Sequence, residues 1–130
     1  MTTTQKIKRR LERFQAFGDE LPKAKVYYRN DWEVLYFDLY GKMFGMMSPE
    51  AIETATITLK GPPAKNEELR EIYSDITPGY HMNKKHWNTI TLSTTQLGDE
   101  EIEGMITLSY RLVAKNLPAA ERKKVEAYWQ

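Results

Sequence analysis

The chain has 130 residues, of which 41% are hydrophobic and 28% charged, and 19 basic against 18 acidic side chains leave a formal net charge of +1. This size and composition predict one globular domain that needs no metal or disulfide to fold. The absence of cysteine excludes disulfides and thiolate metal centres. The net charge is close to zero, whereas a dedicated nucleic-acid-binding protein is usually strongly basic.

The first residues, MTTTQKIKRRLERF, lack the apolar segment of a signal peptide. No apolar run approaches the about 18 residues that a membrane span needs. We therefore expect a soluble, cytoplasmic monomer with no membrane contact.

Charge is unevenly distributed along the sequence. Residues 1–18 hold five basic residues and one acid, whereas residues 99–109 hold four acids and no base. Residues 76–98 and 110–130 are again basic in balance. If the basic segments share a face, the neutral total hides a polarised surface.

The first predicted helix carries Ile7, Leu11 and Phe14 on one apolar stripe and meets a stop signal at Gly18. Three arginines lie off this stripe and are expected on a solvated face: Arg9, Arg10 and Arg13.

Residues 24–48 are rich in β-forming side chains, with turn signals at 30–31 and 40–41. A hairpin is predicted between Val34–Leu39 and Lys42–Met47. Residues 54–60 alternate apolar and polar side chains, as in a half-buried strand.

A helix is predicted over residues 64–76, with Leu69, Ile72, Tyr73 and Ile76 facing inward. A strand is expected over 87–92, and a long helix begins at Asp99 and ends before Pro118. The order of elements predicts an α+β fold, with an antiparallel sheet and helices packed on one face. Residues 1–118 form the expected domain, and residues 119–130 a helical extension.

One stretch, ITPGYHMNKKHWNTITL (76–92), contains both histidines of the chain, His81 and His86. Five residues apart, they share no helical face and point to opposite faces of a strand, and no other His or Cys completes a metal site. The sequence also lacks G-x-S-x-G, P-loop and G-x-G-x-x-G motifs. We expect no metal, no cofactor and no enzymatic activity.

Nucleic-acid binding is a third interpretation of this stretch. Lys84 and Lys85 can neutralise phosphates, Asn83 and Asn88 can hydrogen-bond phosphates or base edges, and His81 and Trp87 can stack on bases. The competing structural interpretation makes Tyr80, Met82 and Trp87 core anchors, with Asn83 bonding the loop backbone and the lysines merely solvated. From composition alone, the structural interpretation is favoured.

PGYHMNKKHWNT (78–89) closely resembles the signature of the MmcQ/YjbR family of small bacterial proteins. The resemblance extends to LYGKMFGMMS (39–48), ITLK (57–60), EELREIY (67–73) and DEEIEGMITLSYRLVAKNLP (99–118). It departs from the family pattern at residues 24–38, and the tail 119–130 runs beyond the usual end.

The resemblance implies a compact α+β domain similar in shape to CyaY (frataxin-like) proteins, and a DNA-binding role through projecting β wings. An iron-handling role, which the same shape suggests, requires acidic side chains on a first helix that is basic here.

We therefore expect a non-enzymatic protein that contacts double-stranded DNA through a basic loop. The candidate residues are Lys84, Lys85, His81, Asn83, His86, Asn88 and Trp87, with Lys42 from the hairpin as a weaker candidate. The alternatives are a protein-interaction module with no nucleic-acid role and a small-molecule pocket lined by Tyr80, His81 and Trp87.

Overall fold

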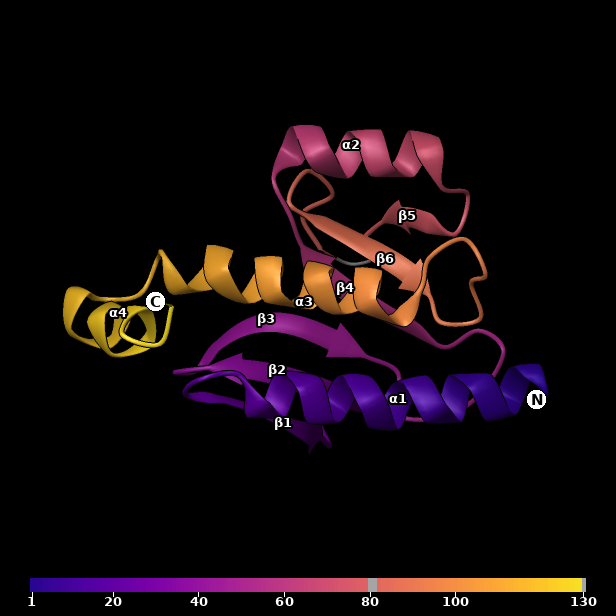
Figure 1. Ribbon diagram of the computed structural model, residues 1–130, viewed down its shortest axis with the longest axis horizontal. Coiled ribbons are helices and arrows are strands. Elements are labelled where there is room, and N and C mark those ends of the chain that lie inside the picture. The colour runs from indigo at the N-terminus through magenta and orange to yellow at the C-terminus, as the bar shows by residue number, and fades with distance from the viewer. Residues whose placement is uncertain (80–81, 130) are drawn as a thin grey trace.

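The computed structural model describes residues 1–79 and 82–129, and its centre is a six-stranded antiparallel sheet (Figure 1). In chain order, the elements are α1 (Thr3–Glu20), β1 (Ala24–Arg29), β2 (Val34–Leu39), β3 (Lys42–Met47), β4 (Thr56–Lys60), α2 (Pro63–Ile72), β5 (Ile76–Pro78), β6 (Trp87–Thr91), α3 (Asp99–Ala114) and α4 (Ala119–Glu126). The strands lie in the order β1-β2-β3-β4-β6-β5. The predicted α+β class is confirmed. Within this part of the chain, no helix combines the length and apolarity needed to cross a membrane.

Helices α1, α2 and α3 pack on the same face of this sheet. A Cβ atom on Gly18 of α1 would lie 2.5 Å from the ring of Phe37 in β2, so helix and sheet approach closely there. Leu59 of β4 lines a common cavity with Leu69 of α2 and Met105 of α3. Phe37 and Leu59 both face Gly45 of β3, and they therefore lie on one side of the sheet.

The hairpin predicted between residues 34–39 and 42–47 is confirmed, with Tyr40 and Gly41 at φ values of 52° and 83° in its turn. Positive φ at both central residues is typical of a type I′ turn, whose twist suits a hairpin. Asp38 supports the turn by accepting the N–H of Gly41 at 2.6 Å.

The helix predicted over 64–76 was too long at its C-terminal end. It ends at Ile72, which is 58% exposed rather than buried, and Tyr73 is extended. Ile76 instead begins the short edge strand β5 and pairs with Ile90. Pairing with β6 accounts for the difference, because the Asp75 carbonyl accepts the N–H of Thr91 and Ile76 lies in the strand ladder, so this segment is extended rather than helical.

Between β3 and β4, a serine from α3 completes the hydrogen bonds at a β-bulge. Phe37 pairs with Gly45 and Asp38 with Met43, which leaves Phe44 as an extra residue in β3. The Ser109 hydroxyl donates to the Phe44 carbonyl and accepts the N–H of Lys60. This bond pair fixes the C-terminal half of α3 over one end of the sheet.

The solvated face predicted for the arginines of α1 is wrong for Arg10, whereas the side chains of Arg9 and Arg13 are 42% and 38% exposed. Arg10 is only 3% exposed, and its guanidinium donates to Asp99 and to three backbone carbonyls, those of Leu92, Thr94 and Leu97. Arg9 and Arg13 also pair with Asp99, and Arg13 with Glu103. Because α1 and α3 lie side by side, two carboxylates of α3 pair with the three arginines and offset part of the positive charge of the N-terminal segment (Figure 1).

Candidate nucleic-acid interface

The loop before β6, which we call the lysine loop (residues 82–86), is held by backbone hydrogen bonds from neighbouring elements. Arg70 of α2 donates to the Lys84 carbonyl at 2.9 Å, and Asn66 of α2 donates to the Lys85 carbonyl at 3.1 Å. The N–H of Gly61 donates to the His86 carbonyl at 3.0 Å. Three successive carbonyls of the loop are therefore bound internally.

Asn83 closes the turn within the lysine loop. Its side-chain oxygen accepts the N–H of Lys85 at 2.9 Å, and its backbone carbonyl accepts the N–H groups of His86 and Trp87. Asparagine commonly stabilises turns in this way. The structure thus uses Asn83 to shape the loop.

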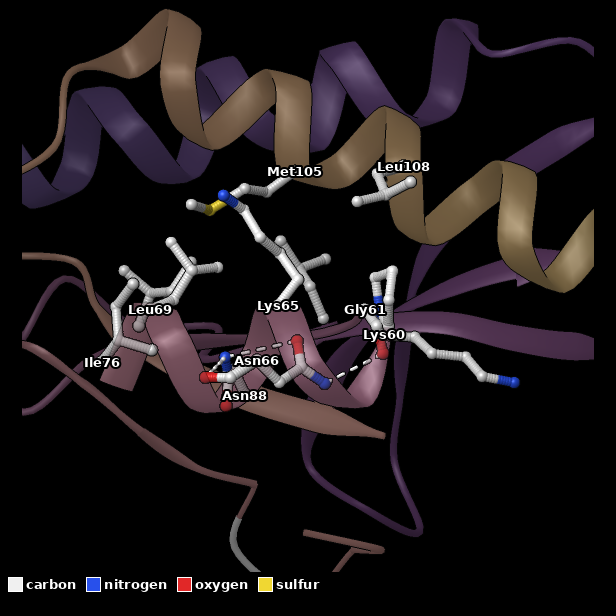
Figure 2. A pocket seen from close by; sticks show the side chains of 12 residues that line it. Lys60, Gly61, Lys65, Asn66, Leu69, Ile76, Asn88, Met105 and Leu108 are labelled. Carbon is white, nitrogen blue, oxygen red and sulfur yellow. Dashed lines mark hydrogen bonds between the residues drawn. The ribbon is translucent and has the colours of Figure 1, made fainter. Parts of the chain in front are cut away.

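Two buried asparagines connect the loop to α2 and β6. Asn66 and Asn88 are 2% and 5% exposed, and the Asn88 amide nitrogen donates to Asn66 (Figure 2). The Asn88 oxygen accepts from Arg70 at 2.9 Å, and Asn66 also donates to the Gly61 carbonyl. Asn88 is therefore occupied by the protein and supports the loop instead of reaching a ligand.

The side chains of Lys84 and Lys85 lie outside this network. Both residues are exposed, and neither forms an ion pair with any residue of the described ranges 1–79 and 82–129. His86 and Trp87 are half-buried. Trp87 lies on the sheet face opposite the helices, because its neighbour Asn88 pairs with Leu59 of the core face.

The strand register brings three further lysines to the same end of the sheet. Lys60 pairs with Trp87, Lys42 pairs with Leu39, and Lys25 lies one residue after Ala24, which also pairs with Leu39. The side chain of Lys60 runs away from the cavity between α2 and α3 (Figure 2). We call this set the basic end of the sheet: Lys25, Lys42, Lys60, Lys84 and Lys85.

A carboxylate at this end of the sheet, Asp38, is engaged in local hydrogen bonds. Asp38, which pairs with Lys25 across β1 and β2, accepts from the Tyr27 hydroxyl at 2.9 Å and from the N–H of Gly41. Four strand spacings separate β1 from β6, so the basic end extends over roughly 19 Å.

Metal binding receives no support from the described residues. Across 1–79 and 82–129, no group of three or more His, Asp or Glu side chains is arranged to hold a metal ion. The apolar cavity between α2 and α3 has a volume of about 30 Å³, room for about one water molecule. Two of the residues predicted to line a ligand pocket, Tyr80 and His81, lie outside the described residues.

A second surface feature lies at the opposite end of the sheet and was not identified from the sequence. In the turn between β1 and β2, the Arg29 guanidinium lies 3.8 Å from the centre of the Trp32 ring and pairs with Asp31 at 2.6 Å. Trp32 also packs edge-on against Tyr36 and remains 50% exposed. The sequence Arg-Asn-Asp-Trp (29–32) indicated a turn, but the cation–π contact between Arg29 and Trp32 depends on how the hairpin folds.

Comparison with known proteins identifies relatives over most of the chain. The YjbR family model matches residues 19–112. The uncharacterized protein YjbR of Escherichia coli K12 is 32% identical over 102 residues, which are 78% of this chain and 85% of that protein. The uncharacterized protein YbdF of Escherichia coli O157:H7 is 34% identical over 106 residues, 82% of this chain and 85% of that one.

Solved structures show the same fold. The crystal structure of Deinococcus radiodurans protein DR2400 superposes with a TM-score of 0.78 at 33% identity and covers 89% of this chain and 87% of its own. A Pseudomonas syringae protein superposes with a TM-score of 0.65 at 24% identity, over 78% of this chain and 96% of its own.

Proposed function

The chain belongs to the YjbR family, and we propose that it is a non-enzymatic DNA-binding protein that contacts phosphates through the basic end of the sheet. The observation that carries this proposal is the anchoring of the lysine loop. The carbonyls of Lys84 and Lys85 are bound by α2, while their ammonium groups extend into solvent without ion pairs among the described residues.

Preorganisation is the first argument for phosphate binding. A loop whose backbone is already fixed loses little conformational entropy when its side chains meet a ligand. Lysine is a compact point charge suited to phosphate oxygens. Lys84 and Lys85 are thus presented from a supported backbone, with Lys60 beside them on β4.

The neighbourhood of the lysine loop favours a polyanion over an apolar partner. Lys42 and Lys60 lie at the same end, whereas Met47 is buried and Met46 and Met82 are partly buried. The three arginines of α1 do not contribute to this surface, because they pair with Asp99 and Glu103 of α3. A duplex carries one charge per about 1.7 Å of its axis, so a basic row of roughly 19 Å faces several phosphates.

The contacts expected from this geometry are with phosphates rather than base edges. Asn88 is buried and occupied, and Asn83 is used within the loop. Phosphate contacts carry no sequence information directly. We expect weak, salt-sensitive binding that is independent of DNA sequence.

Amide chemical shifts test the location of this site. When ¹⁵N-labelled protein is titrated with a short duplex at low salt, the largest shifts are expected at Lys42, Lys60 and residues 83–87. Residues 29–33, in the turn at the opposite end of the sheet, serve as the internal control. Shifts that centre on 29–33, or no shifts at low salt, would refute the proposal.

One observation favours the second candidate function, a protein-interaction module. Tryptophan, tyrosine and arginine dominate binding energy at protein interfaces, and Arg29, Trp32 and Tyr36 form such a cluster with Trp32 half exposed. For that function, Trp32→Ala would abolish partner capture and Lys84→Ala/Lys85→Ala would leave it intact. The opposite pattern would exclude the cluster as the binding surface.

A further inference from the structure

Gly104, in the middle of α3, has no function within the described fold. It is exposed, and a Cβ atom built on it meets no other atom within 4 Å. Glycine inside a helix is less stable than alanine, because it loses more backbone entropy on folding. No turn, close contact or positive φ at this position explains why the residue is glycine.

Gly104 belongs to an exposed stripe along the outer side of α3, opposite the residues that enter the core. The stripe repeats at alternating steps of three and four residues: Glu101, Gly104, Leu108, Arg111 and Lys115. All five are exposed, and Leu108 is 39% exposed although it is a large apolar side chain. This spacing places the five residues on one face of the helix, where a second helix can pack along them.

The stripe is complementary to itself when two helices run antiparallel. A two-fold axis at the level of Ile106 sets Gly104 of one copy opposite Leu108 of the other, since both are two residues from the axis. The same axis sets Glu101 opposite Arg111, each five residues away. The interface therefore contains each contact twice: Leu108 of one copy fills the space beside Gly104 of the other, and Glu101 of one copy faces Arg111 of the other.

From this self-complementarity, we propose that α3 is a self-association surface on which a second copy of this chain packs in an antiparallel, two-fold symmetric dimer. The occupant is a second copy because one pattern supplies both halves of each contact. The proposed dimer differs from the monomeric state that we expected from the sequence.

The surroundings of the stripe suit such a contact. Leu108 and Met105 border the apolar cavity between α2 and α3, so an incoming leucine finds apolar neighbours (Figure 2). α3 lies between α1 and α2, and its outer side is uncovered in the described structure except where Trp129 lies against Arg111 (Figure 1). Arg111 lies over the Trp129 ring at 5.1 Å, which orients its guanidinium and leaves the residue exposed.

Sedimentation velocity over concentrations on the order of 1–200 µM tests the proposal, since weak dimers have dissociation constants in this range. The unmodified chain is expected to shift from monomer toward dimer as concentration rises. Leu108→Asp should remain monomeric. Ile52→Asp is the matched control, because Ile52 is 50% exposed and lies outside α3, and it should dimerise like the unmodified chain.

Three further variants separate self-association from a structural role. Gly104→Ala should raise the thermal midpoint of the monomer but weaken dimerisation by about tenfold, because the new methyl occupies the space for Leu108. Arg111→Glu and Glu101→Arg should each be monomeric alone and form a heterodimer when mixed. A monomeric unmodified chain, a Leu108→Asp variant that still dimerises, or a mixture that stays monomeric would each overturn the proposal.

Discussion

Arg70 donates to the backbone carbonyl of Lys84 at 2.9 Å, so a side chain of α2 fixes the loop that presents two lysines to solvent. The same guanidinium nitrogen donates to Asn88, which is bound in turn to Asn66. These contacts make the lysine loop part of the folded scaffold. The exposure of the Lys84 and Lys85 side chains therefore depends on residues outside the loop, such as Asn66 and Arg70.

Asn66→Ala should weaken both the fold and DNA binding. The substitution leaves the carbonyls of Gly61 and Lys85 without their donor, which costs about 1–3 kcal/mol for buried groups. Urea unfolding and a DNA titration measure the two effects. Asn116→Ala, at an exposed position after α3, is the control and should change stability by less than about 0.5 kcal/mol. An Asn66→Ala variant with unchanged stability and affinity would show that the network does not support the loop.

Ser109→Ala should destabilise the protein by about 1–3 kcal/mol, because it leaves the Phe44 carbonyl and the Lys60 N–H without a partner in a buried region. Thr107→Ala, on the same helix and half-buried, controls for helix propensity. Denaturant unfolding compares the two. Equal stability of both variants would mean that the bulge needs no bond from α3.

Arg10→Met should be the most destabilising of these substitutions, by about 3 kcal/mol or more, because it leaves the buried carbonyls of Leu92 and Leu97 without this donor, at about 1–3 kcal/mol each, and removes one of the arginines paired with Asp99. DNA affinity of the folded variant should be unchanged, since this charge is buried away from the basic end. Lys8→Ala, exposed on the same helix, should lose little stability. If Arg10→Met instead lost DNA binding while remaining fully folded, α1 would belong to the binding surface.

The Asp99 carboxyl makes stability depend on pH in the acid range. Burial raises its pKa, but the hydrogen bonds and the charge attraction from Arg9 and Arg10 together outweigh burial and hold the pKa below its ordinary value. A carboxyl with a depressed pKa stabilises the fold above its unfolded pKa of about 3.9, and that contribution is lost as pH falls through the folded pKa.

Unfolding free energies measured between about pH 5 and pH 2 should therefore fall more steeply for the unmodified protein than for Asp99→Asn. At neutral pH, the variant should be the less stable of the two, since its amide keeps the shape of the side chain and loses the charge. If the unfolding free energies of both proteins fell in parallel with pH, Asp99 would not be the group responsible for the loss of stability in acid.

Much of the fold follows from local sequence patterns. Alternation at residues 54–60 and the Tyr40-Gly41 turn predicted a strand and a hairpin that the structure contains. The family resemblance, quoted on residues 78–89 and their flanks, is confirmed by the family match over 19–112. These features are set by neighbours along the chain, and the sequence can therefore report them.

The errors came from contacts between segments distant in sequence. The partners of the buried Arg10, namely Asp99 and three backbone carbonyls, lie 82 to 89 residues away, and nothing near Arg10 in the sequence indicates them. Strand β5 depends on pairing with β6, which helical periodicity across residues 64–76 obscured. Within the candidate site, the sequence identified the exposed lysines, but the roles of Asn66 and Arg70 required the packing of α2 against the loop.

The salt dependence of DNA affinity tests the proposed function most directly. Removing one lysine–phosphate interaction should reduce the slope of log K against log salt by about 0.9, so Lys84→Ala/Lys85→Ala should reduce it by roughly 1.8 and weaken binding at low salt. Lys8→Ala is the control for removal of one exposed lysine elsewhere. A double variant with the same slope and affinity as the unmodified protein would contradict phosphate binding by the lysine loop.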